Sequence, residues 1–193
     1  MFLFSCFLEF ERWWGGFYLL NEEEIRWIVN NLFVGNKLSQ GEARLGPGRY
    51  FDLKSIKQPI IVFASMGDNI TPPQQAFNWI ADLYSSTDEI KANGQTIVGL
   101  IHEDVGHLGI FVSGKVAKKE HAQIFEVLKY IQTLPPGLYG MEIHEIQHAG
   151  GEVTYDVTLH ERSLEALKKL QKYDRVDEKP FEAVAAISEF NQR

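Results

Sequence analysis

The chain has 193 residues, of which 45% are hydrophobic and 23% are charged, and this composition excludes a disordered or fibrous protein. A formal net charge of -7 argues against nucleic acid as a main partner, because phosphate binding requires clustered lysines and arginines that are scarce here. The single cysteine, Cys6, excludes an internal disulfide and a thiolate metal site, and it favours a reducing, cytoplasmic compartment.

The N-terminal stretch MFLFSCFL is apolar, yet it lacks the features of a secretory signal peptide. No lysine or arginine precedes the apolar residues, Glu9 and Glu11 follow them, and no small-residue cleavage site is present. No run approaches the roughly 18 apolar residues that a membrane-spanning helix requires. We therefore expect neither a signal peptide nor a membrane span, and this stretch is expected to form a buried or partner-facing edge.

Residues 1–55 are predicted to form an aromatic-rich, cap-like helical segment and a connection. Acidic residues and then apolar residues at helical spacing occupy positions 22–32, and Asn21 is a suitable N-cap for this helix. The stretch GEARLGPGRYFDLKSI, residues 41–56, is rich in turn-forming residues. The pattern indicates a helix that leads through an irregular connection into a separate core.

Residues 56–137 are predicted to form an α/β core made of two strand, loop and helix units. The runs PIIVFAS at 59–65 and TIVGL at 96–100 are short, continuous and apolar, as expected for strands that are buried on both faces. Helical spacing follows each run, at 74–84 and at 116–134. Two such units in succession predict parallel strands with flanking helices.

Two loops at the carboxyl ends of these strands carry the polar side chains of interest. Asp68 lies in GDNITPP after the first strand, where Thr71 is also expected to cap the next helix, and His107 lies in HEDVGH after the second. Taken singly, Asp68 is explained as a turn former and His107 as a hydrogen-bonded loop histidine. Together they follow the order in which an α/β-hydrolase sheet presents the last two members of its triad.

We expect Asp68 and His107 to lie within hydrogen-bonding reach, because the carboxyl ends of paired parallel strands meet at one edge. In a triad, the histidine takes a proton from the nucleophile and later returns it, while the carboxylate orients the ring and stabilises its cation. His102 is expected to end its strand, and Glu103 and Asp104 are expected to be solvated loop charges.

The segment HEIQH, residues 144–148, matches the His-Glu-x-x-His pattern of zinc proteases. The third histidine of the extended pattern is absent, since Thr154 occupies its place, although Glu165 remains available as a ligand. Prolines before the segment and glycines after it argue against the required helix. Alternating apolar residues at 153–159 predict instead a hairpin whose first strand is GMEIHEIQ, and we expect no metal or other cofactor.

The stretches FLEFERWWGGFYLLNEEEIRWIVNNLFVGNKLSQGE, FDLKSIKQPIIVFASMGDNITPPQQAFNWIADLY and TIVGLIHEDVGHLGIFVSGKVAKKEH carry a resemblance to a known family. From about Phe7 to about Ile146, the chain resembles the C-terminal part of a bacterial family of large proteins related to polyhydroxyalkanoate synthases. The segments Gly-Asp-Asn-Ile-Thr-Pro-Pro and Gly-His-Leu-Gly-Ile-Phe make the resemblance specific.

The resemblance implies the C-terminal part of an α/β-hydrolase fold, with Asp68 as the triad acid and His107 as the triad base. The substrate would be an acyl ester or acyl thioester. Trp13 and Trp14 would belong to a cap inserted before the acid and would line an acyl pocket, although tryptophans at such positions are more often core residues. Beyond the resemblance, the residues at 138–193 predict by their own pattern the hairpin followed by a helical appendage, which we expect to be truncated.

The chain departs from that family in lacking a nucleophile. No Gly-x-Ser-x-Gly or Gly-x-Cys-x-Gly occurs, and Cys6 has no neighbouring glycine to form the sharp turn. We therefore expect a fragment that carries the acid and base of an acyltransferase or esterase, is inactive alone, and needs the missing N-terminal half of the hydrolase domain as a partner. The alternative is a non-catalytic binding or scaffold module of the same fold.

Overall fold

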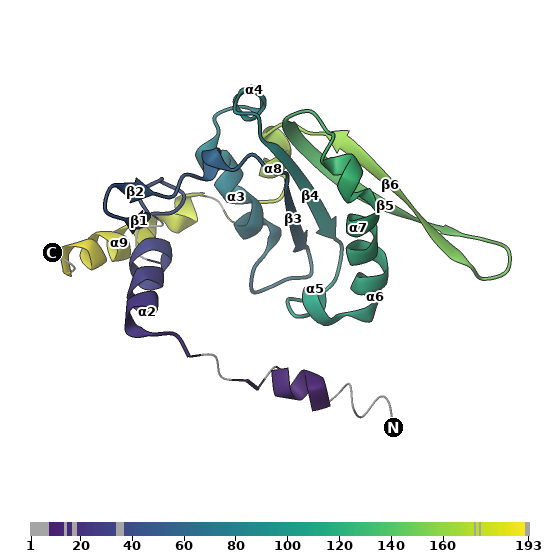
Figure 1. Cartoon of the computed structure of the whole chain (residues 1–193), viewed down its shortest axis with the longest axis horizontal. Coiled ribbons are helices and arrows are strands. Elements are labelled where there is room, and N and C mark those ends of the chain that lie inside the picture. The colour runs from purple at the N-terminus through teal and green to yellow at the C-terminus, as the bar shows by residue number, and fades with distance from the viewer. Residues whose placement is uncertain are drawn as a thin grey trace.

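The computed structural model of the protein describes residues 8–13, 15–16, 19–33, 37–171, 173 and 175–191. Its centre is a four-stranded sheet in the order β3-β4-β5-β6 (Figure 1). The first three strands are mutually parallel and the last pair is antiparallel, so the protein is α/β with a mixed sheet. The strands are β3 (Ile60–Ser65), β4 (Thr96–His102), β5 (Gly137–Gln147) and β6 (Val153–Glu161).

Both predicted core strands are confirmed, and so is the predicted hairpin. The hairpin also extends the core sheet, because β5 pairs in parallel with β4 from Thr96 opposite Gly137 to Leu100 opposite Met141. This third parallel strand was not predicted, since two glycines in GLYG directly after two prolines give no apolar strand pattern. Beyond that pairing, the β5–β6 hairpin projects past the helices (Figure 1).

Helices cover both faces of the sheet and bury the apolar runs. Phe77 and Ile80 of α3 (Pro73–Leu83) pack with Ile97 of β4 in one core cluster. Ile131 of α7 (Ala122–Ile131) packs with Val98 of β4 in the other cluster. Adjacent residues of β4 thus face opposite cores, as expected for a strand buried on both sides. Each fully buried aliphatic side chain contributes about 1.5–3 kcal/mol to this packing.

The N-terminal part begins with a short helical segment at 8–13 and continues with α2 (Glu22–Ile28). The predicted cap at Asn21 is confirmed: its side chain accepts from the Glu24 amide at 2.8 Å, and the Glu24 carboxylate accepts from the Asn21 amide at 2.9 Å. The chain then forms the π-helical turn η1 (Val29–Phe33), the small hairpin of β1 (Arg44–Gly46) and β2 (Arg49–Tyr50), and the 3-10 turn η2 (Leu53–Ser55).

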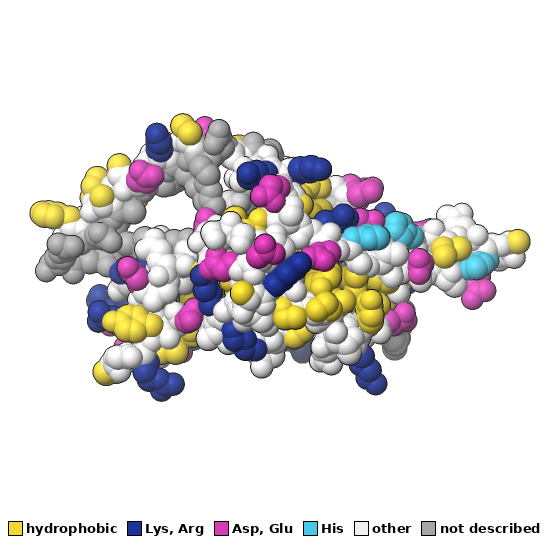
Figure 2. Space-filling view, turned by 90° about the horizontal axis from the view of Figure 1, so that it is seen from above, with side chains coloured by type: hydrophobic (Ala, Val, Ile, Leu, Met, Phe, Trp, Pro, Cys, Tyr) yellow, Lys and Arg dark blue, Asp and Glu magenta, His cyan; other side chains and the backbone are white. Residues whose placement is uncertain are grey.

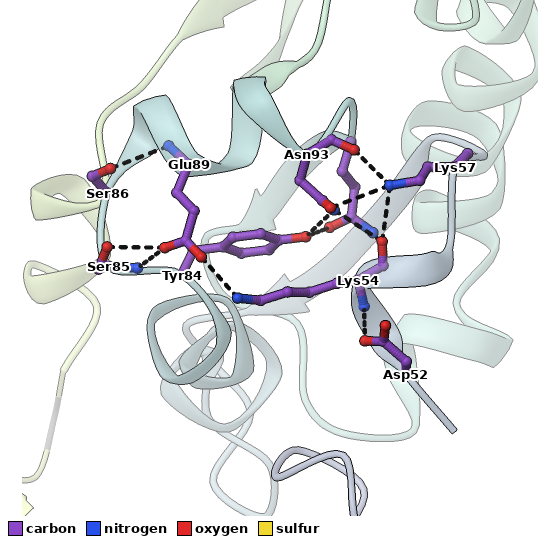
Figure 3. Close-up of polar contacts among 9 residues, drawn as sticks. Asp52, Lys54, Lys57, Tyr84, Ser85, Ser86, Glu89 and Asn93 are labelled. Carbon is purple, nitrogen blue, oxygen red and sulfur yellow. Dashed lines mark hydrogen bonds and ion pairs between the residues drawn. The ribbon is translucent and has the colours of Figure 1, made fainter. Parts of the chain in front are cut away.

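A polar network attaches the connection before β3 to the core (Figure 3). Lys54 Nζ donates to Glu89 Oε1 at 2.8 Å, and this hydrogen bond is the largest cause that lowers the pKa of Glu89 to about 2. The buried Tyr84 hydroxyl donates to Gln95 Oε1 at 2.5 Å and accepts from Asn93 Nδ2 at 2.9 Å. Because these polar groups satisfy one another, we interpret the network as structural.

The remaining elements connect and flank the sheet. The helix predicted over 116–134 is observed as a helical run with a π-helical turn inside it, ahead of α7. Within the ranges that the structure describes, no helix is long and apolar enough to cross a membrane. The elements are α4 (Thr87–Ala92), α5 (Gly109–Val112), α6 (Gly114–Val116), η3 (Ala117–His121), α8 (Glu165–Lys168), η4 (Arg175–Glu178) and α9 (Lys179–Asn191).

Figure 2 views the molecule from the side of the amino ends of β3 and β4. On this face, lysines and arginines are interspersed with acidic side chains and do not form a continuous basic surface. Histidine side chains gather toward the β5–β6 hairpin, which carries His144, His148 and His160.

Candidate functional site

The candidate site lies where β3 and β4 end side by side, with Ser65 opposite His102 in the parallel register. The loops that follow bring His107 Nδ1 to 2.8 Å from Asp68 Oδ2. The predicted proximity of the two side chains is therefore confirmed, while their catalytic roles remain predictions. The Asp68 side chain is fully buried, whereas that of His107 is 32% exposed. A buried carboxylate thus supports an imidazole that can be reached from outside.

Hydrogen bonds from the loop itself hold the Asp68 carboxylate in place. Oδ1 accepts from the backbone amides of Ile70 at 2.9 Å and Thr71 at 2.8 Å, and Oδ2 accepts from the Thr71 hydroxyl at 2.7 Å. Burial raises the pKa of Asp68, but the hydrogen bonds from Thr71, His107 and Ile70 together outweigh burial and lower this pKa below its ordinary value. Asp68 is therefore a carboxylate anion at neutral pH.

The anionic carboxylate fixes the orientation and tautomer of His107. Nδ1 donates to Asp68 Oδ2, and it also lies 3.0 Å from the Thr71 oxygen, which accepts a share of the same hydrogen. With the proton on Nδ1, the neutral ring keeps an unprotonated Nε2. An imidazole arranged in this way can accept a proton at Nε2 and be stabilised as a cation by Asp68.

Thr71 is a site residue that the sequence reasoning missed. It was expected to cap the following helix, but that prediction was wrong: the helix begins at Pro73, and the N-cap is Pro72, which makes no side-chain cap bond. The hydroxyl of Thr71 is instead used by Asp68 and His107. The spacing Asp-x-x-Thr in a turn was the available indication, since Asp side chains in turns accept backbone amides two or three residues on.

Close packing fixes the two loops against each other. The Ser65 hydroxyl donates to the Val105 carbonyl at 2.6 Å, and the Gly67 amide donates to the Ser65 hydroxyl oxygen at 3.2 Å. A Cβ at Gly67 would lie 2.4 Å from the Asp104 carbonyl oxygen, so only glycine fits this approach. The position of His107 therefore depends on both loops.

The other polar residues after β4 lie where the sequence predicted. His102 is the last residue of β4 and is buried, while Glu103 and Asp104 are exposed loop residues.

The HEIQH segment lies on a strand, which confirms the predicted hairpin. His144 is in β5 opposite Asp156, and His148 follows the strand end and contacts the Thr154 hydroxyl at 2.8 Å. Four residues of extended chain span roughly 13 Å, too far for both histidines to bind one metal ion. Among the described residues, no group of three or more His, Cys, Asp or Glu side chains is placed to hold a metal.

Of the two predicted pocket residues, the structure describes Trp13, which does not lie at the strand ends. Trp13 belongs to the helical segment at 8–13, is 54% exposed, and sits on a helix that Figure 1 shows apart from the sheet. Trp14 and Cys6 are outside the described residues. A cavity of about 680 Å³ lies instead at the amino end of β3, where Leu53 and Ile60 are among its lining residues. Neither Asp68 nor His107 is among the residues that line this cavity.

These features describe an α/β protein with a carboxylate and imidazole pair at the carboxyl ends of adjacent parallel strands. Residues 4–193 match the family described as "Protein of unknown function (DUF3141)", and the chain belongs to this family. It is 46% identical over 192 residues to a Rhizobium meliloti protein described as "Uncharacterized protein in ackA 5'region". That match takes in 96% of this chain but 26% of the relative, so the chain spans about a quarter of the relative's length. No solved structure matches the chain.

Proposed function

We propose that this chain supplies the acid and the base of an acyl-transfer or ester-hydrolysis triad of the α/β-hydrolase type. The observation that carries the proposal is the contact of the buried, anionic Asp68 with Nδ1 of His107 at 2.8 Å. A histidine that needs only to be hydrogen-bonded does not require a fully buried carboxylate as its partner. The parallel order of β3 and β4, with the acid first and the histidine second, supports the same assignment.

In the proposed reaction, a hydroxyl or thiol nucleophile transfers its proton to His107 Nε2 as it attacks the acyl carbonyl. The resulting imidazolium is stabilised by Asp68, and the proton is then given to the leaving group. The sequence has no nucleophile elbow, so the nucleophile would come from another segment of a longer protein. The Rhizobium relative is such a longer protein, since the match covers 26% of it. The 193-residue chain alone would have no turnover.

The surroundings of the pair suit an apolar partner or substrate. Met66 and Ile70 flank Asp68 in the loop after β3, and both are more than half exposed. Leu108 and Phe111 follow His107 and are 44% and 69% exposed. Large apolar side chains around a polar pair would contact an acyl chain or a covering segment. The outer edge of β3, which has no strand partner in the described residues, offers backbone groups for a further strand.

The proposal is tested with a longer protein that includes this segment. Hydrolysis of p-nitrophenyl esters with short and long acyl chains, and release of thiol from acyl thioesters, would be measured for the longer protein and for the 193-residue chain. We expect turnover only in the longer protein and its loss in His107→Ala. The matched control is His160→Ala, because His160 is an exposed histidine on β6.

Two results would count against the proposal. Turnover that survives His107→Ala would place the base elsewhere. A longer protein that hydrolyses and transfers none of these acyl groups, while still binding acyl thioesters, would favour a non-catalytic binding module of the same fold.

A further inference from the structure

His102 ends β4 and is 7% exposed, and it contributes no group to the pair formed by Asp68 and His107. Its Nδ1 lies 3.2 Å from the backbone nitrogen of Asp104 and 3.2 Å from that of Val105, and both amides donate to it. A nitrogen that accepts two hydrogen bonds carries no proton. The neutral ring of His102 therefore has its proton on Nε2, the opposite arrangement to that of His107.

A second carboxylate lies on the protonated side of this ring. Glu120, in the π-helical turn η3, is 2% exposed, and its Oε1 lies 3.6 Å from His102 Nε2. This distance exceeds that of a hydrogen bond, but the negative charge at short range in a buried place still favours a proton on Nε2. Oε2 of Glu120 has no hydrogen-bond partner in the part of the chain that the structure describes. Lys119 Nζ lies 3.8 Å from Oε1 and reduces the effect of the charge on His102, but its side chain is partly exposed and this contact is longer than that of His102 Nε2.

One group favours the other tautomer. The Asp104 carboxylate lies 3.4 Å from His102 Nδ1 and would attract a proton to that nitrogen. Its side chain is 78% exposed, so water screens it and it can turn away. The two amide hydrogens are part of the backbone and cannot turn away without moving the loop. The amides therefore decide the tautomer, and Nδ1 is the acceptor.

The segment held by His102 is the one that packs against the loop of Asp68. Val105 accepts the Ser65 hydroxyl at 2.6 Å, and the Asp104 carbonyl lies against Gly67 with no space for a Cβ. His107 follows two residues later. Without the acceptor at His102 Nδ1, the amides of Asp104 and Val105 would be unpaired. The loop would then lose two hydrogen bonds that fix the backbone just before His107.

We propose that His102 is a positioning residue for His107, with Glu120 holding His102 in the tautomer whose Nδ1 accepts the loop amides. His102 is thereby the link between the sheet and the proposed base. The effect of His102 on turnover rests on the proposed function, whereas the tautomers of His102 and His107 do not depend on it. A metal ion at His102 Nε2 would require the ring proton to lie on Nδ1, and the two amides that donate to Nδ1 oppose this.

The test uses histidine-selective ¹⁵N labelling of the 193-residue chain, in which NMR shifts report the protonated nitrogen of each ring. In the wild type, we expect His102 with a proton on Nε2 and His107 with a proton on Nδ1. In His102→Leu, the His107 Nδ1–H state should be lost in favour of a solvent-like mixture. His102→Asn should restore this state, because Asn Oδ1 occupies the place of His Nδ1 and accepts the same amides.

Several outcomes would overturn the proposal. A wild-type His102 protonated on Nδ1 contradicts it directly, and so does a His107 that keeps its Nδ1–H state in His102→Leu. His102→Leu is compared only if it keeps the far-ultraviolet circular dichroism of a folded chain. If it unfolds, the wild type alone tests the proposal, through its histidine tautomers and the hydrogen exchange of the Asp104 and Val105 amides. Slow exchange of these amides supports the proposal, and fast exchange refutes it.

In a longer, active protein, His102→Leu should lower kcat by roughly 10²-fold, the loss that a displacement of about 1 Å produces, and His102→Asn should recover most of it. KM should change little, since His102 does not touch the substrate. A longer protein without any turnover would refute the proposed function and leave the NMR result as an independent measurement of the positioning role.

Discussion

Replacing Asp68 by asparagine tests the electrostatics of the site without changing its shape. Asparagine retains one oxygen, which can still accept from the Ile70 and Thr71 amides that now bind Oδ1. Its amide nitrogen, however, is a donor and takes the place of Oδ2, which now accepts from the Thr71 hydroxyl and His107 Nδ1. The variant therefore loses a charge-assisted hydrogen bond and opposes the Nδ1–H tautomer of His107.

The expected loss of stability depends on pH in a definite direction. At about pH 7, losing the charge-assisted bond while leaving a buried donor badly paired should cost about 1–3 kcal/mol in the free energy of unfolding. The pKa of Asp68 is lowered from its ordinary value of 3.8 because hydrogen bonds outweigh burial, so the wild type gains this stability fully above that value. Below pH 3.8, Asp68 takes up a proton in the unfolded chain but stays ionised in the folded chain. Its contribution to the free energy of unfolding then falls by about 1.4 kcal/mol per pH unit.

Urea unfolding of the wild type and of Asp68→Asn, followed by circular dichroism at a series of pH values, measures both effects. The two proteins should differ most near neutral pH and converge as the pH falls below 3.8. Asp156→Asn, on the exposed side of β6, is the control and should change neither the stability nor its pH dependence. A constant difference between wild type and Asp68→Asn across the acid range would refute the inference that Asp68 is a buried anion.

Further changes test other parts of the structure. Gly67→Ala should destabilise the chain by about 1–3 kcal/mol, because its Cβ would lie 2.4 Å from the Asp104 carbonyl, and a thermal melt equal to that of wild type would refute the close approach. Tyr84→Phe should cost about 1–3 kcal/mol in urea unfolding by leaving buried Gln95 without its donor, whereas Tyr130→Phe at an exposed position should be neutral. Elemental analysis should find no zinc held by the HEIQH segment, and one equivalent of zinc that disappears in His148→Ala would overturn the strand-based argument.

Much of the core was predictable because its strands are buried on both faces. Such strands produce continuous apolar runs, and β3 and β4 have this pattern. The parallel register then required the loops of Asp68 and His107 to meet, so this pair followed from strand order alone. The hairpin was likewise predictable from its alternating pattern.

The remaining features depend on contacts that no local pattern reveals. The first residues of β5, from Gly137 to Tyr139, form a strand because β4 supplies their partners, not because their own sequence favours one. Thr71 suited a helix cap equally well, and only the position of His107 shows why its hydroxyl is used elsewhere. Glu120 lies in an ordinary charged stretch, KKEH, and its burial beside His102 arises from the packing of η3 on the end of β4.

The central claim is that Asp68 and His107 activate a nucleophile that lies outside this segment. The most direct measurement is covalent labelling of the longer protein with serine-reactive and cysteine-reactive acyl analogues, followed by mapping of the labelled residue by mass spectrometry. The account predicts rapid labelling of one serine or cysteine upstream of this segment, and slow labelling in His107→Ala. Labelling within the 193 residues, or an unchanged rate in His107→Ala, would contradict it.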